Sequence, residues 1–269
     1  MKIKFACAAA AVAMAFAAQT AYADDAPTPE VTVTGSAAIV SQYRFRGISQ
    51  SDNKPAAQMS ITVSHKSGFY VSTWGSSASA GQSAVNIGGS EIDVYGGYTH
   101  AIGKTGITFD GGLYGYLYPG MPSAEYFEIY GSLSKSYGPI SAKVGLNWAP
   151  AQDYFTNLQK VTGVNTPDYN VYEYAELTLS VPKTPVTIHG HLGHTGGGLD
   201  LGYDYIDYTV GASYKWKMLT LDASLVGTDI SHSRATSASL YGVGYTGVAP
   251  QEIYRAGKPV AVISLTASF

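Results

Sequence analysis

The sequence has 269 residues, a formal net charge of −3 and a mean hydropathy of +0.01. This charge makes nucleic acid an unexpected partner, because nucleic-acid-binding domains concentrate positive charge on one face. The chain contains 31 Gly and 22 Tyr, and only 13% of its residues are charged. This composition favours a membrane barrel, in which aromatic residues form interfacial belts and glycine permits strand curvature.

Residues 1–23 have the pattern of a secretory signal peptide. Lys2 and Lys4 precede the apolar run "FACAAAAVAMAFAA", and the small residues of "AYA" end just before Asp24. The run is too short for a membrane helix, which needs about 20 apolar residues. Cleavage before Asp24 would leave 14 of the 16 basic residues against 19 acidic ones, a net charge of −5. It would also leave no disulfide, since Cys7 is the only cysteine.

Apolar and polar side chains alternate along most of the remaining sequence, as in strands with one apolar and one polar face. In "TGITFDGGLYGYLYP", Ile107 and Phe109 share one face. Thr108 and Asp110 take the other face. No convincing helix start or stop signal follows the signal peptide. The pattern predicts strands at residues 35–45, 55–65, 68–76, 90–101, 105–118, 123–137, 140–150, 169–181, 184–194, 205–216, 217–228 and 259–269.

The connections between the predicted strands alternate between tight turns and longer polar loops. Outer-membrane barrels show this asymmetry, with tight turns in the periplasm and long loops outside. The sequence therefore predicts an all-β fold, a transmembrane antiparallel up-and-down β-barrel of about 12 strands with both termini periplasmic. Residues 24–34 would form a periplasmic segment and residues 35–269 the barrel. The role of loops 151–168 and 229–258 stays open, and the second loop would make about 14 strands if it added a hairpin.

The outward face of the predicted strands is apolar. Val71, Val144 and Val210 belong to this face, where an Arg or Lys at the bilayer midplane would cost about 2–4 kcal/mol. The final segment "PVAVISLTASF" ends in Phe269, which is typical of the assembly signal of bacterial outer-membrane proteins. We therefore expect localisation in the outer membrane, with membrane lipid and the barrel-assembly machinery as partners.

The inward face carries most of the charged residues, and acids outnumber bases there. Low-dielectric walls focus the field of such charges, so the sequence predicts a pore with a modest preference for cations. The alternative is that these charges pair across strands and plug the barrel. The predicted pore-lining residues are Arg44, Arg46, Glu91, Asp93, Asp110, Glu128, Lys143, Glu176, His189, His191, Asp207, Lys215 and Asp222.

The stretch "QYRFRGISQSDNKP" places two arginines at the external end of the first predicted strand. Strand parity points Arg44 and Arg46 into the lumen, where pairing with acids would fix the loop. Tyr43 and Phe45 would then face outward. The residues predicted for the interfacial aromatic girdles are Tyr43, Phe45, Trp148, Tyr214 and Trp216, with Tyr43 and Phe45 in the outer girdle. The tyrosines predicted to pack in the lumen or to stack on sugars are Tyr95, Tyr114, Tyr116, Tyr126 and Tyr130.

Three groups of residues have side chains that could serve in catalysis or metal binding. Glu91 and Asp93 would lie about 6–7 Å apart on one strand face. Glycosidase carboxylates lie about 5–9.5 Å apart, but alternation creates many such pairs. His189 and His191 have a metal-binding side chain, although the sequence fixes no carboxylate or thiol beside them. The acidic segment "GLDLGYDYID" lacks the spacing of a calcium loop. We therefore predict no enzymatic activity, no metal and no cofactor.

Several segments resemble the TorF-type family of bacterial porins: "YRFRGISQSDNKPA", "SGFYVSTWGS", "EIDVYGGYT", "YPG", "YFEIYGSLS" and "ISAKVG". The resemblance covers essentially the whole mature chain and is densest from Tyr43 to Pro55. It implies an outer-membrane barrel that passes small hydrophilic solutes by passive diffusion, and it implies no catalytic residue. Two alternatives stay open. One is a closed structural or adhesive barrel whose outer loops bind a partner, and the other is a lipid-modifying enzyme, although no nucleophile elbow occurs.

Overall fold

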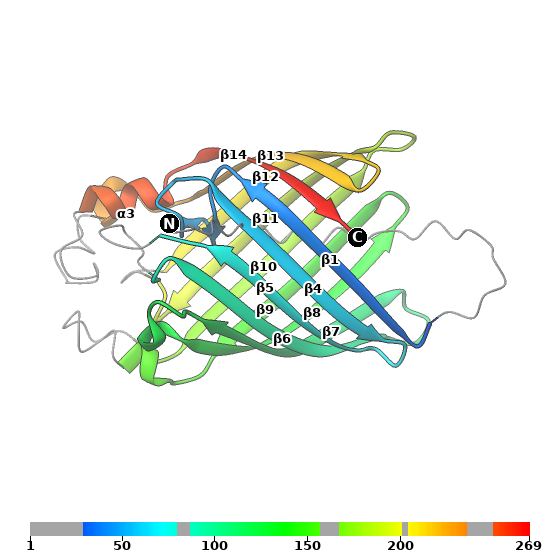
Figure 1. The fold of residues 1–269 in the computed structure, drawn as a ribbon, viewed down its shortest axis with the longest axis horizontal. Coiled ribbons are helices and arrows are strands. Elements are labelled where there is room, and N and C mark those ends of the chain that lie inside the picture. Colours follow the sequence, from blue (N-terminus) through cyan, green and yellow to red (C-terminus); the bar gives the residue numbers. More distant parts are fainter. Residues whose placement is uncertain (1–28, 80–86, 157–166, 201–203, 236–249) are drawn as a thin grey trace, which may run out of the picture.

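Twelve antiparallel strands close into a barrel in the computed structural model of the protein (Figure 1). The structure describes residues 29–79, 87–156, 167–200, 204–235 and 250–269. Closure satisfies the backbone hydrogen bonds of every strand, which a sheet in lipid requires. The barrel strands are β1 (Val31–Val40), β4 (Ala56–His65), β5 (Phe69–Ser77), β6 (Ser90–Ala101), β7 (Ile107–Leu117), β8 (Tyr126–Tyr137), β9 (Ile140–Ala149), β10 (Asn170–Ser180), β11 (Val186–Gly197), β12 (Tyr205–Trp216), β13 (Leu219–Thr228) and β14 (Val260–Ser268).

The predicted all-β barrel with twelve strands is confirmed. β1 pairs with both β4 and β14, and β13 pairs directly with β14. Residues 229–258 therefore add no strands to the wall, and the alternative prediction of about 14 strands is wrong. The predicted signal peptide lies outside the described residues, and so do residues 236–249 of the long loop 229–258.

One helix corrects the prediction that the mature chain has no helix signal. α3 (Pro250–Gly257) precedes β14 at the end of the barrel that carries the long loops (Figure 1). Proline at the first helical position and glycine at the last are ordinary boundary signals, but eight residues are too few for a clear helical period. A short 3-10 helix, η1 (Pro122–Ala124), precedes β8. Among the described residues, no helix has the length and apolar character needed to cross a membrane.

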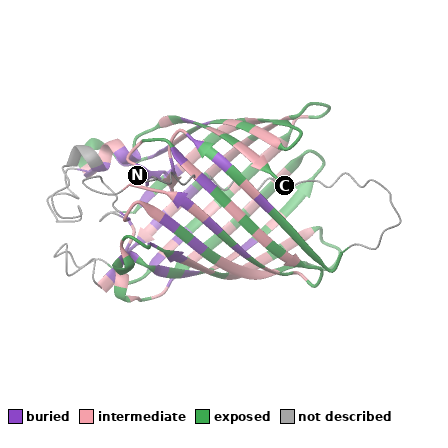
Figure 2. Ribbon diagram, in the orientation of Figure 1, coloured by how far each residue is buried: buried purple, intermediate pink, exposed green. Residues whose placement is uncertain are grey.

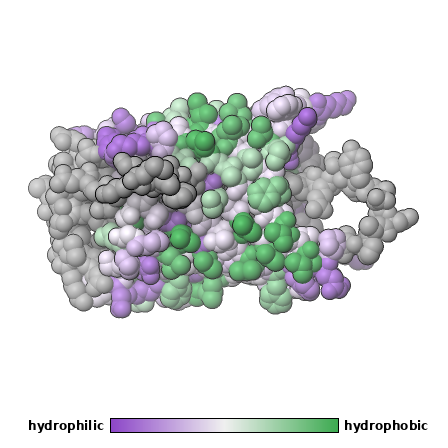
Figure 3. All heavy atoms as spheres, viewed as in Figure 1, coloured by the Kyte–Doolittle hydropathy of each residue, from purple (hydrophilic) through white to green (hydrophobic). Residues whose placement is uncertain are grey.

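Side chains alternate across the barrel wall. Figure 2 shows the buried and exposed residues alternating along the strands. Outward apolar side chains such as Ile39 and Val210 are 64% and 54% exposed, and Figure 3 shows apolar residues over the middle of the barrel with hydrophilic residues towards both ends. This is the outer surface that a lipid bilayer requires. Three of the predicted girdle residues, Trp148, Tyr214 and Trp216, lie on it.

The two ends of the barrel differ in their connections (Figure 1). At one end, here called the turn end, short turns join β4 to β5, β8 to β9 and β12 to β13. At the other, the loop end, longer segments join β5 to β6, β9 to β10 and β13 to β14. Phe269 at the turn end lies against β1, because a Cβ added to Gly35 would lie 2.6 Å from its ring. The assignment of the turn end to the periplasm stays a prediction.

The first strand has different boundaries from those that the alternation of side chains predicted. β1 begins at Val31, inside the predicted periplasmic segment, and ends at Val40 rather than at residue 45. The chain then leaves the wall and folds back into the barrel through β2 (Arg44–Phe45) and β3 (Ile48–Ser49) (Figure 1). We call residues 42–54 the constriction hairpin. Its reversal depends on left-handed backbone at Arg46 and Gly47, with φ of 46° and 77°.

The prediction that Tyr43 and Phe45 belong to the outer girdle is therefore wrong. Tyr43 is 5% exposed, and its ring centroid lies 5.3 Å from that of Trp74 inside the barrel. Phe45 packs edge-on against Tyr116 at 5.6 Å. Parity fails here because it assumes that a strand continues, whereas glycine at position 47 permits the turn that ends it.

Candidate functional site

The lumen contains three groups of side chains that differ in their partners. The first group belongs to the constriction hairpin, which fills part of the loop end of the lumen. The second group, on β5 to β8, is called the acidic wall and comprises Tyr70, Asp93, Tyr95, Asp110, Tyr114 and Tyr130. The third group, on β9 to β13, is called the paired wall and comprises Lys143, Glu176, His189, His191, Asp207 and Asp222.

A buried ion pair holds the constriction hairpin in the lumen. Arg46 Nη2 donates to both carboxylate oxygens of Glu128, at 2.6 and 2.7 Å, and the two side chains are 4% and 0% exposed. Glu128 also accepts hydrogen bonds from Tyr116 and Asn147, and the Arg46 guanidinium lies 4.2 Å from the ring centroid of Tyr172. A charge this deeply buried needs a partner of opposite charge, so the pair acts as a latch, although Arg46 Nη1 is buried without a hydrogen-bond partner.

Arg44, the other arginine predicted to pair with an acid in the lumen, has a different role from Arg46. It donates to the carbonyl oxygen of Gly47 at 2.8 Å and to Asn53 Oδ1 at 3.1 Å, both within the hairpin. It also donates to the carbonyl oxygen of Lys258 at 3.1 Å. The prediction that Arg44 pairs with an acid of the lumen wall is therefore wrong, because its donors are used by the hairpin and by the residue after α3.

A second contact between the hairpin and α3 lies at the loop end. Arg255 donates to the Asp52 carboxylate, which also accepts from Lys54 at 2.7 Å. Asn53 Nδ2 donates to the carbonyl oxygen of Arg255 at 3.2 Å. Burial opposes the charged form of Asp52, but the hydrogen bonds and charges of Lys54 and Arg255 outweigh it and lower the pKa of Asp52 below its usual value.

The carboxylates of β6 and β7 are bonded to tyrosines instead of bases. Tyr114 donates to Asp93 and Tyr70 donates to Asp110, each at 2.8 Å. Above them, the hairpin residue Tyr43 donates to Glu91, also at 2.8 Å. Within the described part of the chain, none of these three acids forms an ion pair. Glu91 and Asp93 also hydrogen-bond each other and so share a proton, and the negative charge that remains on this side of the lumen has no ion-pair partner among the described residues.

Stacked tyrosines run from the acidic wall towards the loop end. The ring centroids of Tyr95 and Tyr114 are 4.5 Å apart with an interplanar angle of 10°. Tyr114 contacts Tyr116 at 4.7 Å, and Tyr116 stacks on Tyr126 at 4.4 Å. Tyr126 stacks in turn on Tyr154 at 5.4 Å. The inward orientation predicted for the first four of these tyrosines agrees with these contacts.

Bases and acids alternate on the paired wall. Lys143 Nζ lies 3.8 Å from Glu176, and His191 lies 3.4 Å from Glu176 and 3.3 Å from Asp207. His189 Nε2 lies 2.7 Å from Asp222. Each partner comes from a neighbouring strand or the next but one, so the sequence did not reveal these pairs. The remaining predicted lumen base, Lys215, is exposed near the turn end.

The alternative chemistries receive no support from this geometry. Glu91 and Asp93 are in hydrogen-bond contact, which leaves no room for the glycosidic bond that two catalytic carboxylates must flank. The three aspartates of "GLDLGYDYID" diverge, because Asp207 is in the lumen, Asp204 approaches His194 and Asp200 accepts from the Gly197 amide. In the described ranges, no group of three His, Cys, Asp or Glu is placed to hold a metal ion.

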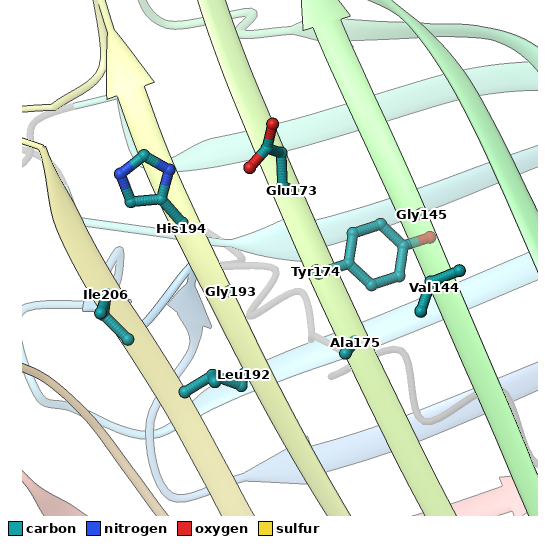
Figure 4. A pocket seen from close by; sticks show the side chains of 9 residues that line it. All are labelled: Val144, Gly145, Glu173, Tyr174, Ala175, Leu192, Gly193, His194 and Ile206. Carbon is teal, nitrogen blue, oxygen red and sulfur yellow. The ribbon is translucent and has the colours of Figure 1, made fainter.

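A shallow pocket occupies the outer surface of β9 to β12 (Figure 4). Glu173 and His194 are cross-strand neighbours in it, and His194 Nε2 lies 3.6 Å from Asp204. These side chains are exceptions to the predicted apolar outer face, and they lie near the loop ends of their strands. The lining residues are Val144, Gly145, Glu173, Tyr174, Ala175, Leu192, Gly193, His194 and Ile206.

A family model described as a bacterial protein of unknown function (Gcw_chp) matches residues 24–269. The chain belongs to the Gcw_chp family. The match begins at Asp24, the residue that follows the predicted cleavage site. The resemblance to TorF-type porins stays a prediction. No curated protein sequence has significant similarity to this Gcw_chp chain.

Solved outer-membrane proteins share the fold of this Gcw_chp chain. The KdgM porin in complex with disordered oligogalacturonate aligns with a TM-score of 0.53 and 11% identity, over 88% of this chain and 99% of that one. The NanC porin aligns with a TM-score of 0.55 and 12% identity, over 88% of this chain and 99% of that one. Outer membrane phospholipase A from Escherichia coli aligns with a lower TM-score of 0.48 and 11% identity, over 91% of this chain and 94% of that one. At these identities the similarity shows the fold alone, that of an outer-membrane β-barrel, and a fold assigns no activity.

Proposed function

We propose that the protein is an outer-membrane porin of TorF type that lets small hydrophilic solutes diffuse passively and prefers cations modestly. The proposal includes export with a cleaved signal peptide, insertion by the barrel-assembly machinery through the strand that ends in Phe269, and a periplasmic turn end. A barrel of twelve strands is wider than an eight-stranded barrel filled by side chains and narrower than general porins of about 16–18 strands. The constriction hairpin narrows the lumen further at the loop end.

The observation that supports cation preference best is the imbalance between the two walls. Glu91, Asp93 and Asp110 accept hydrogen bonds from tyrosines, whereas the acids of the paired wall lie beside bases. A negative charge without a base beside it attracts cations from solution, and low-dielectric walls strengthen the effect. The field in the lumen would then be negative along β6 and β7.

Planar-bilayer recording of the purified protein in a KCl gradient tests both parts of this proposal. We expect discrete channels with a reversal potential on the cation side, and swelling of liposomes in small neutral and cationic solutes. A reversal potential on the anion side would contradict the cation preference. Absence of both conductance and swelling would contradict the channel itself.

The second candidate is a closed barrel whose loops bind a partner outside the cell. The buried latch between Arg46 and Glu128 favours it, because the hairpin that the latch holds occupies the loop end of the lumen. Under this proposal the wild-type protein conducts no ions, and conductance is gained only when the latch is removed. The same bilayer recordings therefore separate the two candidates.

A further inference from the structure

We propose that the constriction hairpin is a gate, which in the wild-type protein moves between the closed position that the structure shows and an open position outside the lumen. The inference rests on the proposed channel function and goes beyond it, because a fixed constriction would only set the width of the pore. It depends on three features of residues 42–54: hydrogen bonds that are largely internal, buried polar atoms that the closed position leaves without partners, and strained backbone at the latch.

The hairpin is held together by its own hydrogen bonds. The Gln50 amide donates to the carbonyl oxygen of Tyr43 at 2.9 Å, and the Tyr43 amide donates to Ser51 Oγ at 2.9 Å. The Asn53 amide donates to Ser49 Oγ at 2.8 Å. These bonds do not involve the barrel strands, so they persist when the hairpin changes its position. The hairpin can therefore turn about its two ends as one body, as hinged elements do.

The contacts between the hairpin and the barrel strands are made by side chains. Tyr43 donates to Glu91 of β6 at 2.8 Å, and Arg46 donates to both carboxylate oxygens of Glu128 on β8. Within the described residues, no other hydrogen bond joins residues 42–54 to a barrel strand. No ladder of backbone bonds has to break before the hairpin leaves the lumen. Elements with so few bonds to their surroundings are the ones that open locally.

The closed position leaves polar atoms buried without partners. Gln58 on β4 is 0% exposed, and neither its Oε1 nor its Nε2 forms a hydrogen bond to a described residue. The same is true of Trp74 Nε1 and Arg46 Nη1. Tyr43 packs on Trp74 and on Ala38, the register partner of Gln58. Unpaired buried polar atoms are destabilising. Movement of the hairpin would hydrate them, which favours the open position.

Strained backbone at the latch acts in the same direction. Arg46 has a φ of 46°, a left-handed conformation that is unfavourable for a residue with a Cβ atom. Five non-glycine residues in the described ranges have positive φ, and three of them, Arg46, Asp52 and Asn53, belong to the hairpin. Such residues persist where the surroundings hold them and are frequent in switch regions. Release of Glu128 would therefore allow the backbone at Arg46 to relax.

Contacts with α3 favour the closed position. Ile48 of the hairpin shares a buried cluster with Ile253 and Ala256 of α3, and Asn53 donates to the carbonyl oxygen of Arg255 at 3.2 Å. These contacts and the latch oppose the strain and the unpaired polar atoms. Opposing contributions of this kind are what an element with two populated positions requires.

The first test locks the gate. In planar bilayers with symmetrical KCl, we expect single wild-type channels to alternate between a low and a high conductance level. The Ser79 amide donates to the carbonyl oxygen of Gln50 at 2.7 Å, which brings the two residues within the range of a disulfide. The oxidised double variant Gln50→Cys with Ser79→Cys should stay at the low level, and reduction should restore the alternation.

The control for this lock is a disulfide at the turn end of the barrel. The hydroxyl oxygens of Ser136 and Ser141 lie 2.7 Å apart, on paired positions of β8 and β9. Oxidation of Ser136→Cys with Ser141→Cys should leave the alternation between the two levels unchanged. Conductance at one level that oxidation of neither double variant alters would overturn the gate and keep the channel.

The second test compares two hydrogen bonds of the same type. Tyr43→Phe keeps the ring on Trp74 but removes the hydroxyl that donates to Glu91. Tyr70→Phe removes an equivalent bond to Asp110, away from the hairpin. The ratio of time at the high level to time at the low level should rise about two- to tenfold in Tyr43→Phe, the size of one hydrogen bond. It should not change in Tyr70→Phe, and equal ratios in the two variants would overturn the gate.

Opening is also measured without current, by labelling of Gln58→Cys with a water-soluble thiol reagent in detergent micelles, with circular dichroism as the check of folding. We expect the folded protein to be labelled, about two- to tenfold faster when Tyr43→Phe is added. Labelling that Tyr43→Phe accelerates, in a protein that passes no current, would contradict the channel and keep the gate. A folded Gln58→Cys protein that is not labelled would overturn the gate.

Discussion

The acidic wall and the paired wall both carry acids, yet the partners of these acids differ. On β9 to β13, each acid lies within reach of a lysine or histidine of another strand. On β6 and β7, each acid accepts a tyrosine hydroxyl. A tyrosine satisfies the hydrogen bond of a carboxylate but leaves its charge in place. The field in a barrel therefore depends on which residues the strand register pairs, and a count of inward charges does not reveal it.

The largest effect is expected where the constriction hairpin is latched to β8. Glu128→Ala leaves the buried Arg46 charge unpaired, which costs about 3–5 kcal/mol. We expect the hairpin to leave the lumen and the conductance to increase. Thiol labelling of Ser49→Cys, a buried position, should become fast in the Glu128→Ala background. Glu173→Ala, on the outer surface of β10, is the control. A Glu128→Ala barrel that conducts and labels like the parent protein would show that other contacts fix the hairpin.

The next prediction concerns the space that glycine leaves for the rings of the acidic wall. A Cβ at Gly112 would lie 2.8 Å from the Tyr130 hydroxyl and 2.6 Å from Gly97 Cα. Gly112→Ala should therefore destabilise the barrel by about 1–3 kcal/mol, the usual cost of overpacking. A Cβ at Gly131 meets nothing within 4 Å, so Gly131→Ala is the matched control. Urea unfolding in lipid vesicles measures the stability of both variants, and equal unfolding midpoints would contradict the packing that we describe.

A smaller effect should follow when the paired wall loses a base. Lys143→Gln removes the positive charge beside Glu176 and makes this wall resemble the acidic one. One unit charge about 5 Å from the ion path changes a cation concentration about fourfold even at the dielectric constant of water. We expect the K⁺ over Cl⁻ permeability ratio to rise by at least about fourfold, because the Cl⁻ concentration falls as the K⁺ concentration rises, and Lys104→Gln in an exposed turn to leave it unchanged. An unchanged ratio would mean that Lys143 does not face the ion path.

The smallest effect is expected at the contact between the hairpin and α3. Because folding lowers the pKa of Asp52, the charged Asp52 stabilises the folded loop above its ordinary pKa, and this contribution is lost as the pH falls through the lowered value. Its size should stay below about 1 kcal/mol, as for other exposed ion pairs. A spin label at Lys258→Cys should become more mobile in acid, and Asp52→Asn should be mobile at every pH. Parallel pH profiles for both proteins would assign the change to another group.

Local patterns in the sequence predicted the barrel but not its interior. The alternation over residues 90–101 and 205–216 gave the bounds of β6 and β12 as the structure has them, because a strand with one lipid face needs period two along its whole length. The same alternation misplaced Tyr43 and Phe45. Nothing in the local pattern distinguishes a continuing strand from one that turns inward at Arg46 and Gly47.

The partners of the lumen residues were beyond prediction for a related reason. Arg46 and Glu128 are 82 residues apart in the chain, and Asp52 and Arg255 are 203 apart. Strand order and register decide which inward side chains meet, and a single sequence does not contain these as local signals. Alternation therefore placed Arg46 and Glu128 inside the barrel, as the structure has them, but it placed Tyr43 and Phe45 outside. It did not predict that the acids of one wall would meet bases and those of the other would meet tyrosines.

The most direct test of the difference between the walls is the reversal potential in a KCl gradient for two matched substitutions. Asp110→Asn and Asp222→Asn each remove one carboxylate charge from the lumen and keep an oxygen that accepts a hydrogen bond. We predict that Asp110→Asn lowers the K⁺ over Cl⁻ permeability ratio by at least about fourfold. Asp222→Asn should change it less, because Asp222 lies 2.7 Å from His189 and shares its charge with that imidazole. Equal shifts in the two variants, or a larger shift in Asp222→Asn, would contradict the account.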